Sequence, residues 1–189
     1  GGRQMYKIDE IRTIVNGLRT LFPELSIKEI LENFESAVEK FGVQVKYAFM
    51  EGDSQNVSGY LMAENNKPVI VLNAEENTRR QRFTLAHELG HLILHWQWLP
   101  GEQINLEDGI FEVSFRKNDI QSYTPEENLR EEDANTFAGE FLIPVEEVEK
   151  LSKEIVDKTK LAKELYKKFN VSYPCASVRV ANLQREGVI

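Results

Sequence analysis

Residues 82–95 read Arg-Phe-Thr-Leu-Ala-His-Glu-Leu-Gly-His-Leu-Ile-Leu-His and hold the only three histidines of the chain, His87, His91 and His95. His87 and His91 enclose Glu88 in the pattern H-E-x-x-H. This spacing puts two imidazoles on one face of a helix, one turn apart, where they can share a Zn²⁺ ion. Glu88 lies between them and can reach a water on the metal. The motif therefore predicts a zinc-dependent hydrolase, in the first place a peptidase.

The motif has this meaning only on a helix, and the neighbouring residues predict one. Thr78-Arg79-Arg80-Gln81 has the form of a capping box that would begin the helix. Apolar residues then recur at helical spacing as far as about Trp96. Gly90 costs about 1 kcal/mol relative to Ala inside a helix, but with Ala86 it would form a groove of small residues that another element can approach closely. The alternative is a chance pentapeptide on an amphipathic helix with solvated histidines.

A catalytic zinc site needs three protein ligands and one open position. His95 is not expected to be the third ligand, because it lies another full turn along an unbroken helix. The metzincin arrangement, with a glycine turn and a third histidine six residues after the second, is absent from this sequence. We expect His95 to cap or pack near the helix C-terminus, where a cationic ring suits the helix dipole.

The third ligand is instead expected to be a carboxylate on a second helix. Thr124-Pro125-Glu126-Glu127 is a strong helix start, and Pro144 ends the run. Within it lie three adjacent acids, which a helix separates by about 100° per residue. Glu131 projects into the apolar face, whereas Glu132 points away and Asp133 lies at the edge. An acid on an apolar face is costly unless it is paired or bound to metal, so Glu131 is the predicted ligand.

The remaining polar residues of this second helix are assigned simpler roles. Glu132 and Asp133 are expected to be solvated. Asn135, one turn after Glu131, is expected to hydrogen-bond a ligand histidine from outside the coordination sphere.

Together, residues 82–95 and the pattern Glu-x-x-Ala-Asn-x-Phe-Ala-x-x-Phe-Leu-Ile-Pro at 131–144 resemble the ImmA/IrrE family of metallo-endopeptidases. The resemblance covers about Val69 to Pro144 and is specific, because two separate motifs occur in the right order. It implies that His87, His91 and Glu131 bind zinc and that Glu88 is the catalytic base. Members of that family are bacterial or phage-borne and cytoplasmic. Several cut helix-turn-helix repressors and so release mobile-element or stress genes, which implies a substrate of this class here.

Composition is compatible with a small cytoplasmic protein of 189 residues, of which 41% are hydrophobic. A single cysteine excludes a disulfide framework within the chain, and no apolar stretch is long enough to cross a bilayer. Residues 1–4 precede Met5 and are interpreted as left over from cloning. The formal charge of −8 argues against DNA as the main partner, because phosphate neutralisation dominates non-specific affinity. It is compatible with docking a basic protein such as a repressor. Oligomeric state is left open.

The rest of the chain predicts an α+β fold. Its centre would be a small antiparallel sheet packed on a zincin-type active-site helix and on the second metal-ligand helix, with extra N- and C-terminal helices. The expected strands are Val43–Phe49, Val57–Met62 and Pro68–Leu72, and Ile110–Phe115 would form a further strand or part of a lid. Val69–Leu72 is the candidate edge strand for pairing with an extended substrate peptide, although a buried core strand fits it equally well.

The expected organisation is a metallopeptidase domain at 5–144 followed by a helical segment at 145–189. This segment resembles a helix-turn-helix with its turn at Asn170, and from Asp157 onward bases outnumber acids. A DNA-binding regulator with a latent or lost peptidase site is therefore the alternative function. A toxin paired with a repressor-like antitoxin would use the same catalytic residues and is a third possibility.

The expected mechanism follows from the ligands. Zinc activates a water and polarises the scissile carbonyl. Glu88 takes the proton of the water and delivers it to the leaving amine. A further donor to the oxyanion is expected, and Tyr60 and Tyr123 are both candidates that the sequence does not separate.

Overall fold

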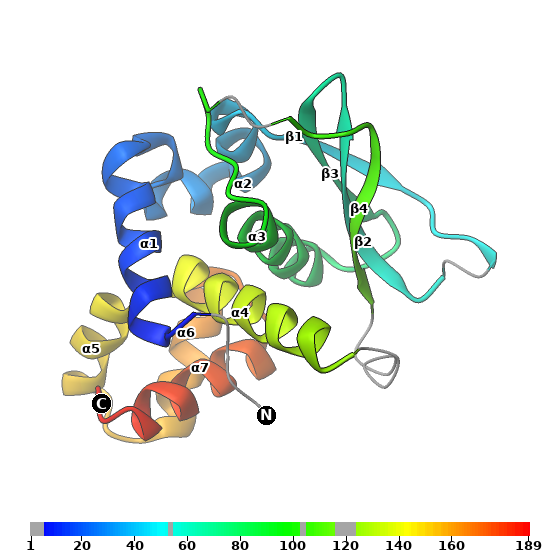
Figure 1. Cartoon of the computed structure of the whole chain (residues 1–189). Helices are drawn as coiled ribbons and strands as arrows, with labels where there is room; N and C mark the ends of the chain where they lie inside the picture. The colour runs from blue at the N-terminus through cyan, green and yellow to red at the C-terminus, as the bar shows by residue number, and fades with distance from the viewer. Residues whose placement is uncertain (1–5, 53–54, 103–104, 116–123) are drawn as a thin grey trace.

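The computed structural model describes residues 6–52, 55–102, 105–115 and 124–189 (Figure 1). The described part is α+β, as predicted, with helices packed around and beside a four-stranded sheet. In chain order, the elements are α1 (Ile8–Leu21), the short 3-10 helix η1 (Pro23–Leu25), α2 (Ile27–Phe41), β1 (Gln44–Ala48), β2 (Val57–Glu64), β3 (Lys67–Asn73), α3 (Thr78–Leu94), β4 (Gly109–Phe115), α4 (Pro125–Leu142), α5 (Val145–Glu154), α6 (Lys158–Phe169) and α7 (Tyr173–Arg185).

The sheet has the strand order β1-β3-β2-β4. Strands β2 and β3 form an antiparallel hairpin through Asn65 and Asn66, whose φ angles of 52° and 62° suit a tight two-residue turn. Strand β1 pairs parallel with β3, so the sheet is mixed rather than wholly antiparallel. Strand β4 pairs antiparallel with β2 and forms the other edge.

The prediction that Val69–Leu72 forms a sheet edge was wrong. These residues belong to β3, which lies between β1 and β2, and all of them are buried. A continuous apolar run is typical of a strand that is covered on both faces, and this is the alternative that the structure supports. The edge next to α3 is instead β4, which confirms a strand at Ile110–Phe115.

Helix α3 is central and lies between the sheet and α4 (Figure 1). It begins one residue earlier than the predicted cap, because Asn77 Oδ1 accepts the Arg80 N–H at 2.9 Å while Gln81 donates to the Asn73 carbonyl at 2.9 Å. The helix ends at Leu94, two residues before the predicted end. Every residue from Thr84 to Leu94 is buried, so the motif lies in the most enclosed element of the fold.

Helix α4 crosses α3 at Gly90, as the groove of small residues predicted. A Cβ placed on Gly90 would lie 3.0 Å from the Cβ, Cγ and Cδ1 atoms of Phe137 on α4. Thr124 begins α4 by accepting the Glu127 N–H at 3.2 Å, and the helix ends at Leu142, just before Pro144. The absence of a side chain at Gly90 therefore sets how close the two motif-bearing helices lie.

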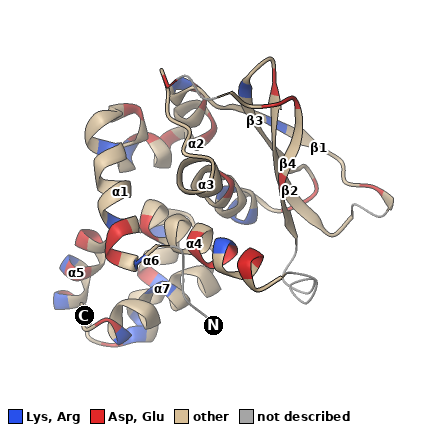
Figure 2. Cartoon of the chain, viewed as in Figure 1, with Lys and Arg blue, Asp and Glu red and all other residues tan. Residues whose placement is uncertain are grey.

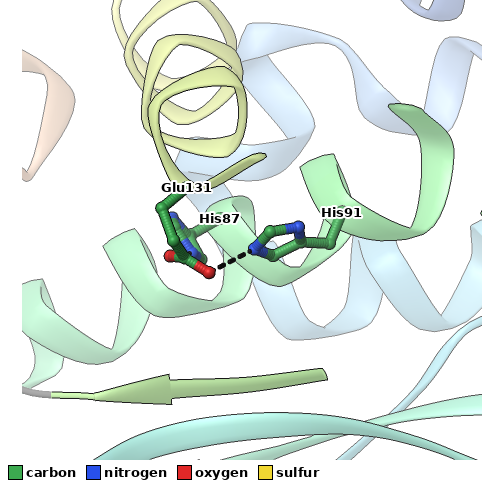
Figure 3. Close-up of side chains that lie close together, drawn as sticks. All are labelled: His87, His91 and Glu131. Atoms are coloured by element: carbon green, nitrogen blue, oxygen red, sulfur yellow. Dashed lines mark hydrogen bonds and ion pairs between the residues drawn. The ribbon is translucent and has the colours of Figure 1, made fainter. Parts of the chain in front are cut away.

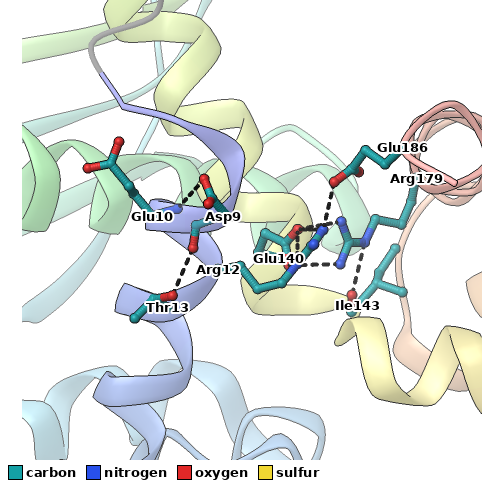
Figure 4. Close-up of polar contacts among 8 residues, drawn as sticks. All are labelled: Asp9, Glu10, Arg12, Thr13, Glu140, Ile143, Arg179 and Glu186. Carbon is teal, nitrogen blue, oxygen red and sulfur yellow. Dashed lines mark hydrogen bonds and ion pairs between the residues drawn. The ribbon is translucent and has the colours of Figure 1, made fainter. Parts of the chain in front are cut away.

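The terminal helices join the same hydrophobic core, which continues from Ile11 on α1 to Leu183 on α7. The buried carboxylate of Glu140 on α4 ties them together (Figure 4). Arg12 on α1 approaches it at 2.6 Å and Arg179 on α7 at 2.8 Å. The expected boundary after Pro144 stays a prediction. Within the described ranges, no helix has both the length and the apolar character to span a bilayer.

Candidate metal centre

The structure brings His87 and His91 of α3 together with Glu131 of α4, and their potential ligand atoms all lie within 4.8 Å of one another (Figure 3). Each carboxylate oxygen of Glu131 faces one ring. Oε2 lies 2.8 Å from His87 Nε2, and Oε1 lies 3.0 Å from His91 Nε2. The three residues that the sequence selected as ligands therefore meet at one point between two helices.

The surroundings of these atoms suit a cation. His87 and His91 are 5% and 0% exposed. His87 Nε2 is buried and has no hydrogen bond of acceptable geometry with any residue that the structure describes, despite the nearby carboxylate. Buried polar atoms usually have a partner, and two imidazoles with one carboxylate are a donor set found in catalytic zinc sites. The residues present therefore fit a metal ion.

The pKa values of His91 and Glu131 favour the deprotonated forms in which these groups bind metal. Burial lowers the pKa of His91 to about 4, so that this ring is neutral at pH 7. Burial would raise the pKa of Glu131, but hydrogen bonds and charges from the two histidines outweigh it and lower that pKa below its usual value. Burial would lower the pKa of His87, and its contacts with Glu131 instead raise it. A metal ion bound here would take the place of a proton between His87 and Glu131, because ligands bind metal in deprotonated form.

Of the three adjacent acids of α4, Glu131 and Glu132 lie on the sides of the helix that the helical geometry predicts. The side chain of Glu131 is 18% exposed and faces α3, while Glu132 is exposed. The prediction of a solvated Asp133 was wrong, because its side chain is 0% exposed. Asp133 lies against His95 Nε2 at 3.3 Å and the Tyr6 N–H at 3.4 Å. Segments far from α4 in sequence cover this carboxylate, which no helical wheel of α4 reveals.

Both metal-facing rings have a partner on their other nitrogen. His87 Nδ1 lies 2.8 Å from Asn135 Oδ1, which places Asn135 where the sequence predicted. Because an amide oxygen only accepts, Nδ1 of His87 donates to Asn135, which leaves Nε2 as the nitrogen that can bind a metal. His91 Nδ1 lies 2.8 Å from His95 Nδ1, so His95 packs at the helix end, as expected, and also contacts a candidate ligand.

Glu88 is completely buried beside this centre. Ser114 on β4 donates a hydrogen bond to its Oε1, whereas its Oε2 has no partner among the described residues. Burial raises the pKa of Glu88 to about 7, with His87 and Ser114 opposing the rise. A carboxylate with a pKa near neutrality is suited to accept and return a proton. The sequence analysis missed Ser114; the available signal was a small polar residue among the apolar ones of a strand.

A cavity of about 340 Å³ adjoins Glu131 and lies between β4 and the beginning of α4. Its floor includes Glu112, which contacts Arg130 and accepts the Trp96 Nε1–H at 3.0 Å. The lining residues are Ile110, Phe111, Glu112, Val113, Phe115, Glu127, Arg130 and Glu131. A groove lined by apolar residues of β4 and charged residues of β4 and α4 thus adjoins the candidate ligand Glu131.

The structure does not select between Tyr60 and Tyr123 as the residue that donates to the oxyanion. Tyr60 lies on β2, opposite Val113 of β4. Tyr123 lies outside the described residues. The donor therefore stays open.

Comparison with known proteins agrees with this fold and this site. The IrrE N-terminal-like domain family, Peptidase_M78, matches residues 38–181, well over half of the chain. No curated protein matches the chain significantly. Among solved structures, a Mycobacterium tuberculosis transcriptional regulator aligns with a TM-score of 0.53 and 15% identity, covering 89% of this chain and 45% of that chain. At this identity the likeness concerns the fold alone, and this chain spans less than half the length of that regulator.

The family match contains the whole candidate centre, including His87, Glu88, His91 and Glu131. It also continues past Pro144 into α7. The chain therefore belongs to the peptidase family that is defined by the IrrE N-terminal-like domain.

Proposed function

We propose that the protein is a zinc-dependent endopeptidase in which His87, His91 and Glu131 hold the metal and Glu88 is the catalytic base. The single observation that carries the proposal is the convergence of these ligand atoms within 4.8 Å beside the buried carboxylate of Glu88. Family membership supports a peptidase. The donor set supports zinc, which favours two imidazoles and a carboxylate with one open position.

In this proposal the protein supplies the metal ligands, the catalytic base and a buried site that surrounds them. Zinc, when bound, lowers the pKa of water and polarises the scissile carbonyl. Glu88 accepts a proton from the attacking water at Oε2, the oxygen that Ser114 does not occupy. Glu88 then returns the proton to the leaving amine. Asn135 holds the His87 ring so that Nε2 faces the metal.

The groove beside β4 supports an extended peptide as the substrate. Strand β4 is an edge of the sheet and also contributes Ser114 to the site. An edge strand can bind a peptide through main-chain hydrogen bonds, with pockets for alternate side chains. Ile110 is 58% exposed and Phe115 36% exposed on this strand, so the groove would accept apolar side chains. The edge strand predicted at Val69–Leu72 is thus replaced by β4 in the same role.

The proposed substrate class is a basic helix-turn-helix repressor in the cytoplasm. The resemblance to the ImmA/IrrE family supports this class, because several of its members cut such proteins. The net charge of −8 is complementary to a DNA-binding protein. A toxin that is paired with a repressor-like partner would use the same residues and would be a special case of this proposal.

The alternative of a DNA-binding regulator has less support from the C-terminal helices. Helix α7 would be the recognition helix, but Arg179 is buried against Glu140, which leaves Arg185 as its exposed cation. On α6, Lys168 pairs with Glu147 at 3.0 Å. Figure 2 shows acidic residues interspersed with the bases of α5–α7. Phosphate binding needs a concentrated positive surface, and this one is mixed.

The test uses the purified protein, zinc and a basic helix-turn-helix repressor, taken from a neighbouring gene where one is encoded there. We expect a discrete fragment of that protein to form, and to be absent with Glu88→Gln, which keeps the ligands but removes the base. Zinc content measured by mass spectrometry should be equal in both proteins. A fragment that forms equally with Glu88→Gln, or a wild-type protein that binds no zinc, would overturn the proposal.

A further inference from the structure

A chain of buried polar contacts runs from α4 through the end of α3 to the candidate centre. Asp133 Oδ2 lies 3.3 Å from His95 Nε2, and His95 Nδ1 lies 2.8 Å from His91 Nδ1. On its far side, His91 Nε2 faces Glu131 Oε1 at 3.0 Å. The side chains of Asp133, His95 and His91 are at most 1% exposed. Water therefore does not compete for these contacts.

The N-terminal segment closes the outer end of this chain. The Tyr6 backbone N–H approaches Asp133 Oδ1 at 3.4 Å, and the Tyr6 hydroxyl donates to the Leu94 carbonyl at 2.6 Å. The Tyr6 ring lies 6.4 Å from the His95 ring. Tyr6 thus covers both His95 and the oxygen of Asp133 that His95 does not use.

The chemistry of these groups determines which atom donates and which accepts in each of these contacts. Because a carboxylate oxygen accepts, the contact with Asp133 Oδ2 favours the His95 tautomer that carries its proton on Nε2 and has an acceptor at Nδ1. When His91 binds metal through Nε2, its ring proton lies on Nδ1, and Nδ1 donates to His95 Nδ1. A histidine that binds metal through one nitrogen commonly donates from the other to a fixed acceptor, which sets its tautomer and ring orientation.

The neighbouring carboxylate on β4 is poorly placed for the same task. Glu112 Oε2 lies 4.0 Å from His91 Nδ1, beyond hydrogen-bond distance. Its other oxygen contacts Arg130 and accepts from Trp96. The partner of His91 is therefore His95.

We infer that His95 and Asp133 are positioning residues, which hold His91 in the tautomer and orientation that bind the metal. The inference rests on the proposed metal site. It explains why a histidine one turn beyond the motif, unable to reach the ion, is nevertheless enclosed beside it. The two candidate ligands are then oriented by different means: His87 by the amide of Asn135, and His91 by an imidazole that is itself held by a carboxylate.

Two substitutions at one position separate this role from packing. Asn carries an oxygen at the place of His95 Nδ1, so His95→Asn can still accept from His91. Gln carries its polar atoms at the place of Nε2, so His95→Gln can still reach Asp133 but loses the acceptor for His91. We expect His95→Gln to bind zinc about 10- to 100-fold more weakly than wild type and His95→Asn to bind within a few fold of it.

Zinc affinity is measured by competition with a chelating dye, and thermal unfolding of the metal-free proteins is recorded beside it. Val178→Ala, a change at an exposed residue of α7, is the control and should keep wild-type affinity. If His95→Asn and His95→Gln bind zinc equally, or if affinity simply follows the unfolding temperature of the metal-free proteins, the inference is wrong. A wild-type protein that binds no zinc would instead overturn the proposed function.

Nitrogen-15 NMR of the zinc-loaded wild-type protein gives a second test that needs no variant. We expect the His91 ring to carry its proton on Nδ1 and the metal on Nε2, with the His95 proton on Nε2. Metal on His91 Nδ1, or a proton on His95 Nδ1 alone, would contradict the inference.

Discussion

Ser114 on the edge strand β4 donates a hydrogen bond to Glu88 on α3, and so connects the outermost strand of the sheet to the proposed catalytic base. The close approach depends on Gly59 of β2, which pairs with Ser114. A Cβ on Gly59 would lie 2.7 Å from Thr84 Cγ2 and 2.8 Å from the Val71 carbonyl oxygen. The sheet therefore lies directly on α3, one turn before Glu88, and Ser114 holds one carboxylate oxygen while the other stays available.

We expect Ser114→Ala to lower kcat about 10-fold, the equivalent of roughly 1.4 kcal/mol for a hydrogen bond to a charged group. KM and zinc content should change little, because Ser114 contacts neither ligand histidine. Ser114→Thr restores a hydroxyl and should recover most of the activity. Ser58→Ala removes another buried hydroxyl, on β2, and serves as the control. Equal kcat values for Ser114→Ala and Ser58→Ala would remove Ser114 from this role.

The activity should rise with pH through about 7. Burial raises the pKa of Glu88 to about 7 and the Ser114 hydrogen bond opposes that rise, so Glu88 gains a proton below this pH and can no longer act as a base. We expect kcat/KM to fall tenfold per pH unit on the acidic side. In Ser114→Ala the acidic limb should move to higher pH. A profile that is flat between pH 5 and 8 would be incompatible with Glu88 as the titrating base.

Metal binding should distinguish two neighbouring acids of α4. Glu131→Ala removes a carboxylate that lies 2.8 Å and 3.0 Å from the two rings, and should lower zinc affinity at least 100-fold. Glu132→Ala changes an exposed residue and should leave zinc affinity unchanged. Zinc content after dialysis reads out both. If Glu132→Ala lowered zinc affinity more than Glu131→Ala, the metal would lie on the side of α4 that carries Glu132.

The spacing of α3 and α4 can be tested at Gly90. Gly90→Ala improves helix propensity, but its new Cβ would press on Phe137 at 3.0 Å in a closed core. We expect a net loss of about 1–3 kcal/mol in the free energy of unfolding and weaker zinc binding. Gly17→Ala makes the same change on α1, where nothing lies within 4 Å, and should stabilise by up to about 1 kcal/mol. Chemical denaturation measures the free energy of unfolding of both variants. If both are more stable than wild type, Phe137 does not require a glycine at position 90.

Glu140 should govern stability rather than catalysis. Burial would raise its pKa, but Arg12 and Arg179 lower it instead (Figure 4). Its stabilisation is therefore present above the pKa of the unfolded chain and is lost as pH falls through the lower folded value. We expect Glu140→Gln to lose about 3 kcal/mol at pH 7 and less at pH 3. Urea unfolding at both values measures this, and an equal loss at both would contradict the linkage.

Local patterns were sufficient for several features that depend on a single helix. The cap at Thr124 and the turn at Asn170 lie where their residue types predict, because each depends on contacts within a few residues. Choosing Glu131 over Glu132 needed only the angle between successive helical residues. These inferences depend only on the 3.6-residue period of the α-helix, which is the same in every helix.

Other predictions failed because their answers depend on residues far away in sequence. Asp133 resembles a solvated acid on α4 alone, and is buried because His95 and Tyr6 cover it. Val69–Leu72 has the composition of either an edge or a central strand, and only the parallel pairing with β1 makes it central.

The histidine and glutamate spacings by themselves predicted a metal-binding site: two rings on one face of a helix and one carboxylate on one face of another, as the helical repeat requires. Only the tertiary structure decided which strand borders the centre, that Ser114 hydrogen-bonds Glu88, and that Asp133 contacts His95. Those contacts join segments separated by tens of residues, and no periodicity within a segment encodes the distance between two segments.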